Sequence, residues 1–316
     1  MHFIDSKAVE KALPYPLLVD ALAHGLQQTI EAPPRIHLTP NHDASCVLIM
    51  PAWRPHQLMG VKLVSVWPGN NAKGEPAVSA AYVLISCENG HPVAVLDGTT
   101  LTLRRTAAAA ALAARKLARQ DSTTLVVLGT GALSVPLVQA HVGVMSFKNV
   151  WVWGRQTRNA LAVVAQLQQA GLDASVATDL EQALSQADVV AAATTATEPF
   201  IRTAWVRPGT HLSLIGAFTA QMAEAEPALM IRAKVFADSR SAVLEKGGEV
   251  FQAIAQGMIS PDGIEAQLAE LVSQADGHWR RDAQEITVFK SVGFASLDLI
   301  AAELVYNTQV GGMPRP

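Results

Sequence analysis

The sequence predicts an α/β protein that combines a doubly wound parallel sheet with a second unit of α+β type. Two patterns in its 316 residues lead to this prediction. Between residues 124 and 293, short apolar runs alternate with helical segments, which is typical of a parallel sheet that helices cover on both faces. Between residues 1 and 119, apolar runs follow one another without intervening helices, which favours an antiparallel or mixed sheet. We therefore expect two domains, residues 1–119 with 294–316 and residues 120–293.

The individual elements follow from apolar spacing and from turn residues. In the first unit we expect a helix over 16–26 and strands over 46–50, 59–67, 81–86 and 92–96. A helix over 101–118 leads into the second unit, and the apolar stripe of a last helix over 294–306 is expected to pack back on the first. In the second unit we expect strands over 124–128, 149–153, 174–177, 189–193, 211–216 and 235–238, with helices up to about 145 and over 158–170, 180–186 and 225–232.

Composition excludes several classes of protein. Half of the residues are hydrophobic, 16% are charged, and the net charge is −3, so no basic excess points to nucleic acid. No apolar run reaches the roughly 18 residues that span a bilayer, and the first residues do not predict a signal peptide. The two cysteines, Cys46 and Cys87, fit no metal or redox spacing, and the histidines form no metal-binding pair. We expect a cytoplasmic protein with no metal and no membrane partner.

The most informative stretch follows the expected strand 124–128. It opens a helix and reads Gly129-Thr130-Gly131-Ala132-Leu133-Ser134. A strand, a Gly-x-Gly turn and a helix form the dinucleotide-binding turn of a Rossmann-type sheet: the first glycine permits the tight turn, the second admits the pyrophosphate, and the helix offers unpaired N–H groups. Because Ser134 replaces the third glycine, the fingerprint is incomplete. The prediction of a dinucleotide site therefore depends on the position of the turn between an expected strand and an expected helix.

The tip of the next expected strand predicts which dinucleotide binds. NAD-specific sheets place an acid there for the ribose 2′-hydroxyl, about 20 residues beyond the turn. This tip has no acid and reads Gly154-Arg155-Gln156-Thr157. A guanidinium suits a 2′-phosphate, so we predict NADPH as the cofactor, with NADH as second choice. The alternative interpretation of Arg155 is a solvated surface charge.

Two hydroxyl residues end another buried strand. Thr194 and Thr195 follow the run 189–193, and ligands of parallel sheets bind beyond the carboxyl ends of the strands. They are candidate cofactor neighbours, although capping of a helix or loop explains them equally well.

Three cations stand out in the first unit. Lys62 lies inside an apolar strand pattern, where it points either to solvent or into a pocket, and the pattern alone favours solvent. Arg105 lies in the early turns of a helix, where a cation opposes the helix dipole unless an anion is beside it. Arg35 follows two prolines and is expected at a strand edge. Together these three side chains offer a site for one carboxylate.

The chain resembles the ornithine cyclodeaminase/mu-crystallin family nearly from end to end. The ordered set of matching pieces is specific, whereas no single piece is. The matching pieces are Pro34-Arg35, Gly60-Val61-Lys62-Leu63-Val64, Pro68-Gly69-Asn70 with Gly74 and Pro76, Asp97-Gly98-Thr99, Leu101-Thr102, Arg105-Thr106-Ala107-Ala108, Gly129-Thr130-Gly131, Arg207-Pro208-Gly209-Thr210-His211, Gly216-Ala217 and Phe289-Lys290-Ser291-Val292-Gly293.

The resemblance implies a homodimer with a Rossmann-type NAD(P)-binding domain and an α+β substrate-binding/dimerisation domain. It also implies that Arg35, Lys62 and Arg105 hold the carboxylate of an amino or imino acid. Contacts with the cofactor are implied for four further residues, Thr106, Gly216, Ser291 and Gly293, and for Thr106 a contact with the substrate is the alternative. For Gly293, capping of a turn is an open alternative.

One departure from the family pattern distinguishes its branches. The cyclodeaminases carry an aspartate for the substrate amine two positions after the glycine that Gly216 matches, and this chain has Phe218 there. A phenyl ring neither pairs with an ammonium group nor transfers a proton, but it suits the face of an apolar ring. Phe218 and Arg155 therefore both favour the branch that reduces cyclic ketimines with NADPH.

The resulting hypothesis is an NAD(P)H-dependent reductase of cyclic imino acids. It converts Δ1-pyrroline-2-carboxylate to L-proline, with Δ1-piperideine-2-carboxylate to L-pipecolate as a second reaction, and Lys62 is the candidate catalytic residue that supplies or holds the imine proton. The alternatives are an ornithine cyclodeaminase or alanine dehydrogenase-like enzyme, and a non-catalytic small-molecule binder of the mu-crystallin kind.

Overall fold

The computed structural model describes residues 1–41, 45–276 and 278–311, and the chain divides into two compact units. Unit 1 comprises residues 1–106 and continues from residue 294, and unit 2 comprises residues 107–293. The boundary falls inside helix α3 (Gly98–Leu117), whereas the predicted boundary after residue 119 lies just beyond the end of that helix. Residues 312–316, the end of the predicted first domain, lie outside the described part.

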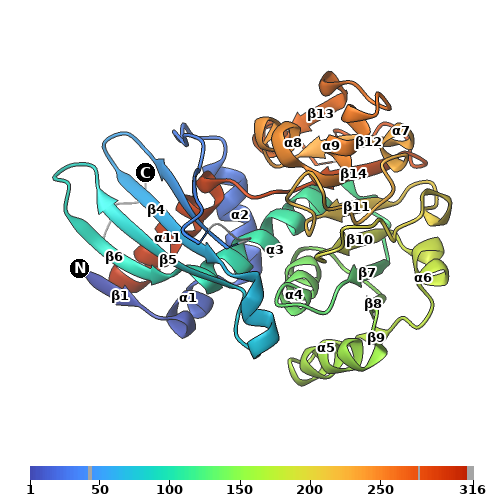
Figure 1. The fold of residues 1–316 in the computed structure, drawn as a ribbon, viewed down its shortest axis with the longest axis horizontal. Helices are drawn as coiled ribbons and strands as arrows, with labels where there is room; N and C mark the ends of the chain where they lie inside the picture. The colour runs from blue at the N-terminus through green and yellow to red at the C-terminus, as the bar shows by residue number, and fades with distance from the viewer. Residues whose placement is uncertain (42–44, 277, 312–316) are drawn as a thin grey trace. The chain divides into compact units, whose positions relative to one another are not determined.

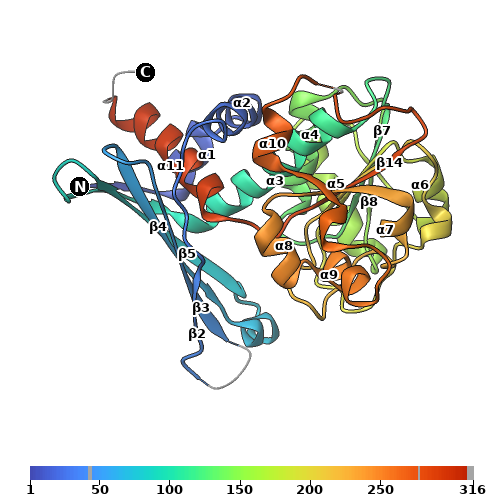
Figure 2. The same ribbon diagram turned by 90° about the horizontal axis from the view of Figure 1, so that it is seen from above.

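Unit 1 is a six-stranded mixed sheet with helices on one face. The strands, in the order β1-β6-β5-β4-β3-β2, are β1 (His2–Ile4), β6 (Pro92–Asp97), β5 (Val78–Ser86), β4 (Leu58–Val66), β3 (Cys46–Trp53) and β2 (Ile36–Leu38). All neighbours are antiparallel except β1 and β6. Figure 2 shows α1 (Ser6–Ala12), α2 (Tyr15–Gly25) and α11 (Ala295–Val310) on the same side of this sheet. A short 3₁₀ turn (Pro68–Lys73) joins β4 to β5.

The two faces of this sheet differ in burial. Along β4, buried residues alternate with partly exposed ones, so Gly60, Lys62 and Val64 face the helices. The opposite face is apolar, and none of its large side chains is buried. Cross-strand register brings seven of these side chains together: Phe3, Ile36, Ile49, Val61, Leu63, Val83 and Val95.

Unit 2 is an eight-stranded, entirely parallel sheet. Its strands, in the order β13-β12-β14-β11-β10-β7-β8-β9, are β13 (Ile264–Gln267), β12 (Ala233–Ala237), β14 (Ile286–Lys290), β11 (His211–Leu214), β10 (Val189–Ala192), β7 (Thr124–Leu128), β8 (Asn149–Trp153) and β9 (Ser175–Val176). The central strands are fully buried, as expected where helices cover both faces. Figure 1 shows α4 (Ser134–Val144) and α6 (Leu180–Gln186) on opposite sides of the sheet. From β7 the chain adds β8 and β9 on one side, and β10 then lies on the other side of β7, so the order of the strands reverses between β7 and β10.

The remaining helices of unit 2 connect its outer strands. They are α5 (Thr157–Gln169), α7 (Leu229–Arg232), α8 (Arg240–Lys246), α9 (Gly248–Ala255) and α10 (Leu268–Val272), with two 3₁₀ turns at Thr203–Trp205 and Pro261–Gly263. The α/β fold class is confirmed. The helix predicted over 225–232 is wrong for its first half, because an extended bridge between Ile201 and Ala225 holds that segment before α7 begins. Strands β1, β13 and β14 and helices α1, α8, α9 and α10 were not predicted. Among the residues that the structure describes, no helix combines the length and the apolar character needed to span a bilayer.

Candidate functional site

The turn after β7 has the geometry that a dinucleotide needs. Gly129 has φ +122°, and a Cβ there would lie 2.6 Å from the Ala193 carbonyl oxygen, so only glycine fits. The Ser134 hydroxyl is buried and donates a 2.8 Å hydrogen bond to the Gly129 carbonyl oxygen. The serine that made the sequence fingerprint incomplete therefore ties the turn to the first residue of α4.

Gly131 borders open space on the other side of this turn. A Cβ built on Gly131 would meet no atom within 4 Å, and the turn leads directly into the N-terminus of α4. The backbone there is accessible to a phosphate group, and a helix N-terminus favours an anion. The residues present thus fit the pyrophosphate of a dinucleotide. Ala132 and Leu133 complete the turn before α4 begins at Ser134.

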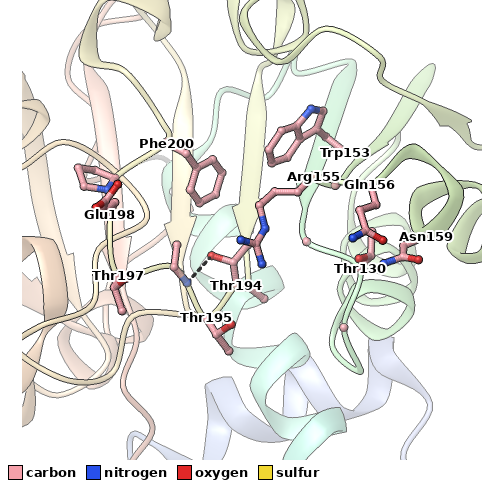
Figure 3. Close-up of a pocket in the computed structure, with 16 residues that line it drawn as sticks. Thr130, Trp153, Arg155, Gln156, Asn159, Thr194, Thr195, Thr197, Glu198 and Phe200 are labelled. Atoms are coloured by element: carbon pink, nitrogen blue, oxygen red, sulfur yellow. Dashed lines mark hydrogen bonds between the residues drawn. The ribbon is translucent and has the colours of Figure 1, made fainter. Parts of the chain in front are cut away.

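An open cavity of about 860 Å³ lies at the carboxyl ends of β7, β8 and β10. This is the point where the winding of the sheet reverses, which is the expected ligand position in such sheets. Figure 3 shows the Arg155 side chain extending into the cavity. Eight predicted cofactor residues line it: Gly129, Thr130, Gly131, Gly154, Arg155, Gln156, Thr194 and Thr195.

The wall of the cavity also contains side chains that sequence reasoning missed. The rings of Trp153 and Phe200 stack with centroids 5.5 Å apart and an interplanar angle of 17°. Glu198 lines the same cavity, from the loop after β10. The predicted residue Thr157 opens helix α5 and is exposed.

A buried carboxylate fixes Thr194 and Gly216. Glu224 is fully buried, and its Oε1 accepts hydrogen bonds from the Thr194 N–H at 2.7 Å and from the Thr194 hydroxyl at 3.0 Å. Its Oε2 accepts from the Gly216 N–H at 2.7 Å. Gly216 packs so tightly that a Cβ would lie 2.0 Å from the Thr194 carbonyl oxygen. The need for glycine at position 216 is therefore explained by contact between the ends of β10 and β11.

A second buried carboxylate organises the end of β14. The Ser291 hydroxyl and the N–H groups of Val292 and Gly293 all donate to Oδ2 of Asp238, at 2.8, 2.9 and 2.6 Å. Gly293 has φ +75°, so it forms a turn that favours glycine. Burial raises the pKa of Asp238 above its usual value, although these hydrogen bonds oppose the shift.

In unit 1, the structure brings two predicted cations onto one carboxylate. Lys62 lies on the buried face of β4, so the solvent-facing orientation that its sequence pattern favoured is wrong. Its Nζ donates to Oδ2 of Asp298 at 2.7 Å, and the Arg105 Nε donates to Oδ1 of the same residue at 2.8 Å. Asp298, in the first turn of α11, is thus an anion beside Arg105, as the sequence predicted for this cation.

Electrostatics within this cluster set the protonation of Lys62. The pKa of Lys62 is lowered to about 8: burial and the positive charges of Arg105 and Arg35 lower it, and Asp298 opposes them. The pKa of Asp298 is lowered, because Arg105 and Lys62 outweigh the opposing effect of burial. Arg35 is half-buried immediately before β2 and acts on Lys62 through its charge. The three predicted carboxylate-binding cations therefore belong to one electrostatic cluster.

Gly60, two residues before Lys62, makes room for a buried tyrosine. A Cβ on Gly60 would lie 2.0 Å from the Tyr82 hydroxyl oxygen. Tyr82 pairs in register with Lys62 across β5 and β4, so the two side chains lie on the same face of the sheet. This explains the glycine of the Gly60-Val61-Lys62 motif by packing.

The other predicted site residues occupy less distinctive positions. Thr106 is buried in α3, directly after Arg105. Phe218 is 45% exposed in the loop after β11. Sequence reasoning missed Asp298, Glu224 and Asp238, although a single acid in the otherwise apolar start of the last helix is a signal for a buried partner of a cation. Among the described residues, no group of three or more histidine, cysteine or acidic side chains is placed to hold a metal ion.

Comparison with known proteins identifies relatives of this chain. A profile of the ornithine cyclodeaminase/mu-crystallin family matches residues 5–312. Δ1-Pyrroline-2-carboxylate reductase of Paracoccus denitrificans is 39% identical over 261 residues, which are 82% of each chain. The structure of Δ1-pyrroline-2-carboxylate reductase of Thermococcus litoralis, in complex with NADH and L-proline, is 28% identical, covers 98% of both chains and has a TM-score of 0.93.

A second solved structure is that of an archaeal alanine dehydrogenase dimer with bound NAD. It is 29% identical, covers 98% of this chain and 96% of its own, and has a TM-score of 0.90. The family resemblance read from the ordered motifs is confirmed. The chain belongs to the ornithine cyclodeaminase/mu-crystallin family.

Proposed function

We propose that this chain is an NAD(P)H-dependent reductase of cyclic imino acids that converts Δ1-pyrroline-2-carboxylate to L-proline. We include the six-membered Δ1-piperideine-2-carboxylate, which gives L-pipecolate, as a second substrate. Reduction of an imino acid is supported by the reductases among the relatives, one of which is solved with NADH and L-proline.

The observation that carries the proposal is the cluster of Lys62, Arg105 and Asp298. Two cations share one anion, so the three groups retain a net positive charge, and Arg35 adds another nearby. A substrate carboxylate matches this excess charge. Charge-assisted hydrogen bonds to a carboxylate contribute roughly 1.5–3 kcal/mol each. Such contacts fix the position of the adjacent carbon–nitrogen double bond, which lowers the entropic part of the barrier.

Lys62 is the group that we assign to the imine proton. A reduced nicotinamide dinucleotide held by the cavity of unit 2 supplies the hydride that adds to the imine carbon. The reaction also places one proton on nitrogen, either before or during reduction. With a pKa of about 8, Lys62 is mostly protonated at neutral pH yet is a better acid than an ordinary lysine. Burial thus fits Lys62 both for binding the acid group and for giving or holding a proton.

Arg155 supports NADPH over NADH. It is exposed in the cavity, and the residues at the tip of β8, Gly154-Arg155-Gln156-Thr157, include no acid that could bind a ribose 2′-hydroxyl. A guanidinium offers a planar fork of N–H donors that matches a phosphate. The two solved relatives contain NADH and NAD, so the ratio of the two cofactors is the property to measure.

The apolar outer face of the unit 1 sheet supports a homodimer. Phe3, Ile36 and Leu63 are 77%, 52% and 42% exposed on that face. A contiguous apolar patch of this kind marks an interaction surface, and self-complementary surfaces are the commonest in symmetric dimers. A second copy of the chain is the occupant that we propose, because the related alanine dehydrogenase is a dimer. The cytoplasm, predicted from the sequence, remains our proposed location.

Phe218 separates the proposal from cyclodeamination. At the position where the cyclodeaminases have the aspartate that handles the substrate amine, this chain presents a phenyl ring that neither binds ammonium nor transfers a proton. Alanine dehydrogenation is the second candidate, because the solved alanine dehydrogenase shares the fold over nearly the whole chain.

One experiment tests these assignments together. Oxidation of NADPH and NADH is followed by absorbance with cyclic and acyclic imino acids, and ammonia release is measured with L-ornithine. We expect turnover with the cyclic substrates and none with L-ornithine. Turnover of pyruvate and ammonia but not of cyclic imines would replace the proposal with alanine dehydrogenation. Ammonia release from L-ornithine would replace it with cyclodeamination, and binding of cofactor without any turnover would favour a binding protein.

A further inference from the structure

We infer that Glu224 is a positioning residue for the cofactor: its buried carboxylate fixes the backbone at the carboxyl ends of β10 and β11, and with it one wall of the cavity. The inference rests on the proposed cofactor site. Glu224 does not line the cavity and therefore acts through Thr194.

The contacts run from the carboxylate to the cavity wall. Glu224 accepts hydrogen bonds from the N–H and the hydroxyl of Thr194, and from the N–H of Gly216. The Thr194 hydroxyl oxygen in turn accepts a bond from the Ala196 N–H at 3.4 Å, which is the dashed line in Figure 3. Thr194, Thr195 and Ala196 all line the cavity. Glu224 thus contacts the lining residue Thr194 directly and the lining residue Ala196 through the Thr194 hydroxyl.

A second layer holds Glu224 itself. The Glu224 N–H donates to Oε2 of Glu249 at 3.2 Å, and Oε1 of Glu249 accepts from the Lys290 ammonium group at 2.9 Å. All three side chains are fully buried, and they come from the loop after β11, from α9 and from β14. Two acids and one lysine leave this network with a net negative charge, which burial disfavours. The network therefore connects β10, β11 and β14 at the end of the sheet where the cavity opens.

The three donors require an ionised carboxylate. Each of its oxygens accepts at least one N–H or O–H in the structure. An amide of the same shape has one acceptor oxygen, so its NH₂ group would face either the Thr194 N–H or the Gly216 N–H. That leaves a buried donor unsatisfied and lets the loop shift.

The titration of Glu224 agrees with this geometry. Burial raises the pKa of Glu224 to about 7, Lys290 opposes the shift, and Glu249 adds to it. The Thr194 and Gly216 N–H groups also favour the ionised form. Protonation turns one acceptor oxygen into a donor, so below neutral pH the loop after β10 loses part of its anchor.

The test compares Glu224→Gln with Glu226→Gln. Glu226 also accepts a backbone N–H, from Thr203 at 2.8 Å, but it pairs with Arg202 outside the cavity. Dissociation constants for NADPH and NADH are measured at pH 8 by fluorescence titration, with thermal unfolding as a check of folding. We expect Glu224→Gln to bind about ten- to a hundredfold more weakly, and Glu226→Gln to bind within about twofold of the parent, well below that loss.

Each outcome decides the inference. A folded Glu224→Gln protein with the parent's affinity overturns it, and so does an equal loss in the control. If Glu224→Gln does not fold, the parent's affinity for NADH is measured from pH 8 to pH 6, since NADH lacks the 2′-phosphate that itself titrates near pH 6. Weakening toward pH 6 supports the inference, and a constant affinity overturns it. If the parent binds neither dinucleotide, the proposed function fails first.

Discussion

Replacing Asp298 with asparagine tests the charge balance of the unit 1 cluster. Asp298 is fully buried on α11, 2.7 Å from the Lys62 Nζ and 2.8 Å from the Arg105 Nε. Asparagine keeps the shape of the side chain but removes the charge that both cations face. Both cations then lose the group that positions them, and we expect the equivalent of one charge-assisted bond to the substrate carboxylate, roughly 1.5–3 kcal/mol, to be lost, which predicts a decrease of about tenfold to 150-fold in kcat/KM.

The pH dependence gives the more specific signature. Asp298 raises the pKa of Lys62, whereas burial, Arg105 and Arg35 lower it, with a balance at about 8. Without the Asp298 charge the pKa of Lys62 falls below that value. If activity needs protonated Lys62, kcat/KM of the parent declines as pH rises through about 8, and the decline in Asp298→Asn moves to lower pH.

The assay is kcat/KM for the cyclic imine between about pH 6 and 9.5, a window that spans both the usual and the lowered lysine values. The matched control is Glu303→Gln on the same helix, because Glu303 pairs with a buried arginine, Arg54, through two 3.1 Å contacts. We expect the control to lose stability without a shift of the pH profile. A profile of Asp298→Asn that declines at the same pH as the parent would refute the coupling of Asp298 to Lys62.

Three further predictions follow from single positions. Arg155→Asp should lower the preference for NADPH over NADH by about tenfold or more, given the strength of guanidinium–phosphate pairs; an unchanged ratio of kcat/KM values would contradict the assignment. Gly129→Ala should lower the free energy of unfolding by roughly 1–3 kcal/mol, measured in denaturant, because of its φ of +122° and the nearby Ala193 oxygen. Leu63→Glu should shift sedimentation from dimer to monomer, and an intact dimer would exclude the outer sheet face as the interface.

Local pattern was enough to predict much of the fold. The strands β7, β8 and β10 are continuous apolar runs, and the glycine turn after β7 is a short-range signal, so both could be read from consecutive residues. Strand β14 was missed because it contains Thr287 and Lys290, whose burial depends on partners elsewhere in the chain. The sequence shows that a residue is polar, but it does not show the distant partner whose interaction offsets the free-energy cost of burying it.

The residues of the candidate site also divide into those that local sequence patterns predicted and those that only the fold brings together. Arg155 and the glycines at 129 and 131 are read from position relative to a strand, and the structure places them around one cavity. Asp298 is separated from Lys62 by 236 residues, so only the fold brings the two together. This explains why the sequence around Lys62 favoured an orientation toward solvent. The alternation of residues along a strand describes neighbours in the sequence, and it contains no information about a carboxylate on the last helix.

The position of Asp298 along the chain sets an order of events during synthesis. Both cations of its cluster are made before the whole of unit 2, and Asp298 follows Arg105 by 193 residues. At about 5–20 residues per second, the ribosome needs roughly ten to forty seconds to reach the counter-ion. For that interval the nascent amino-terminal sheet carries an ammonium and a guanidinium that water solvates better than an apolar interior, so we expect its helix-covered face to close only after the parallel sheet has been synthesised.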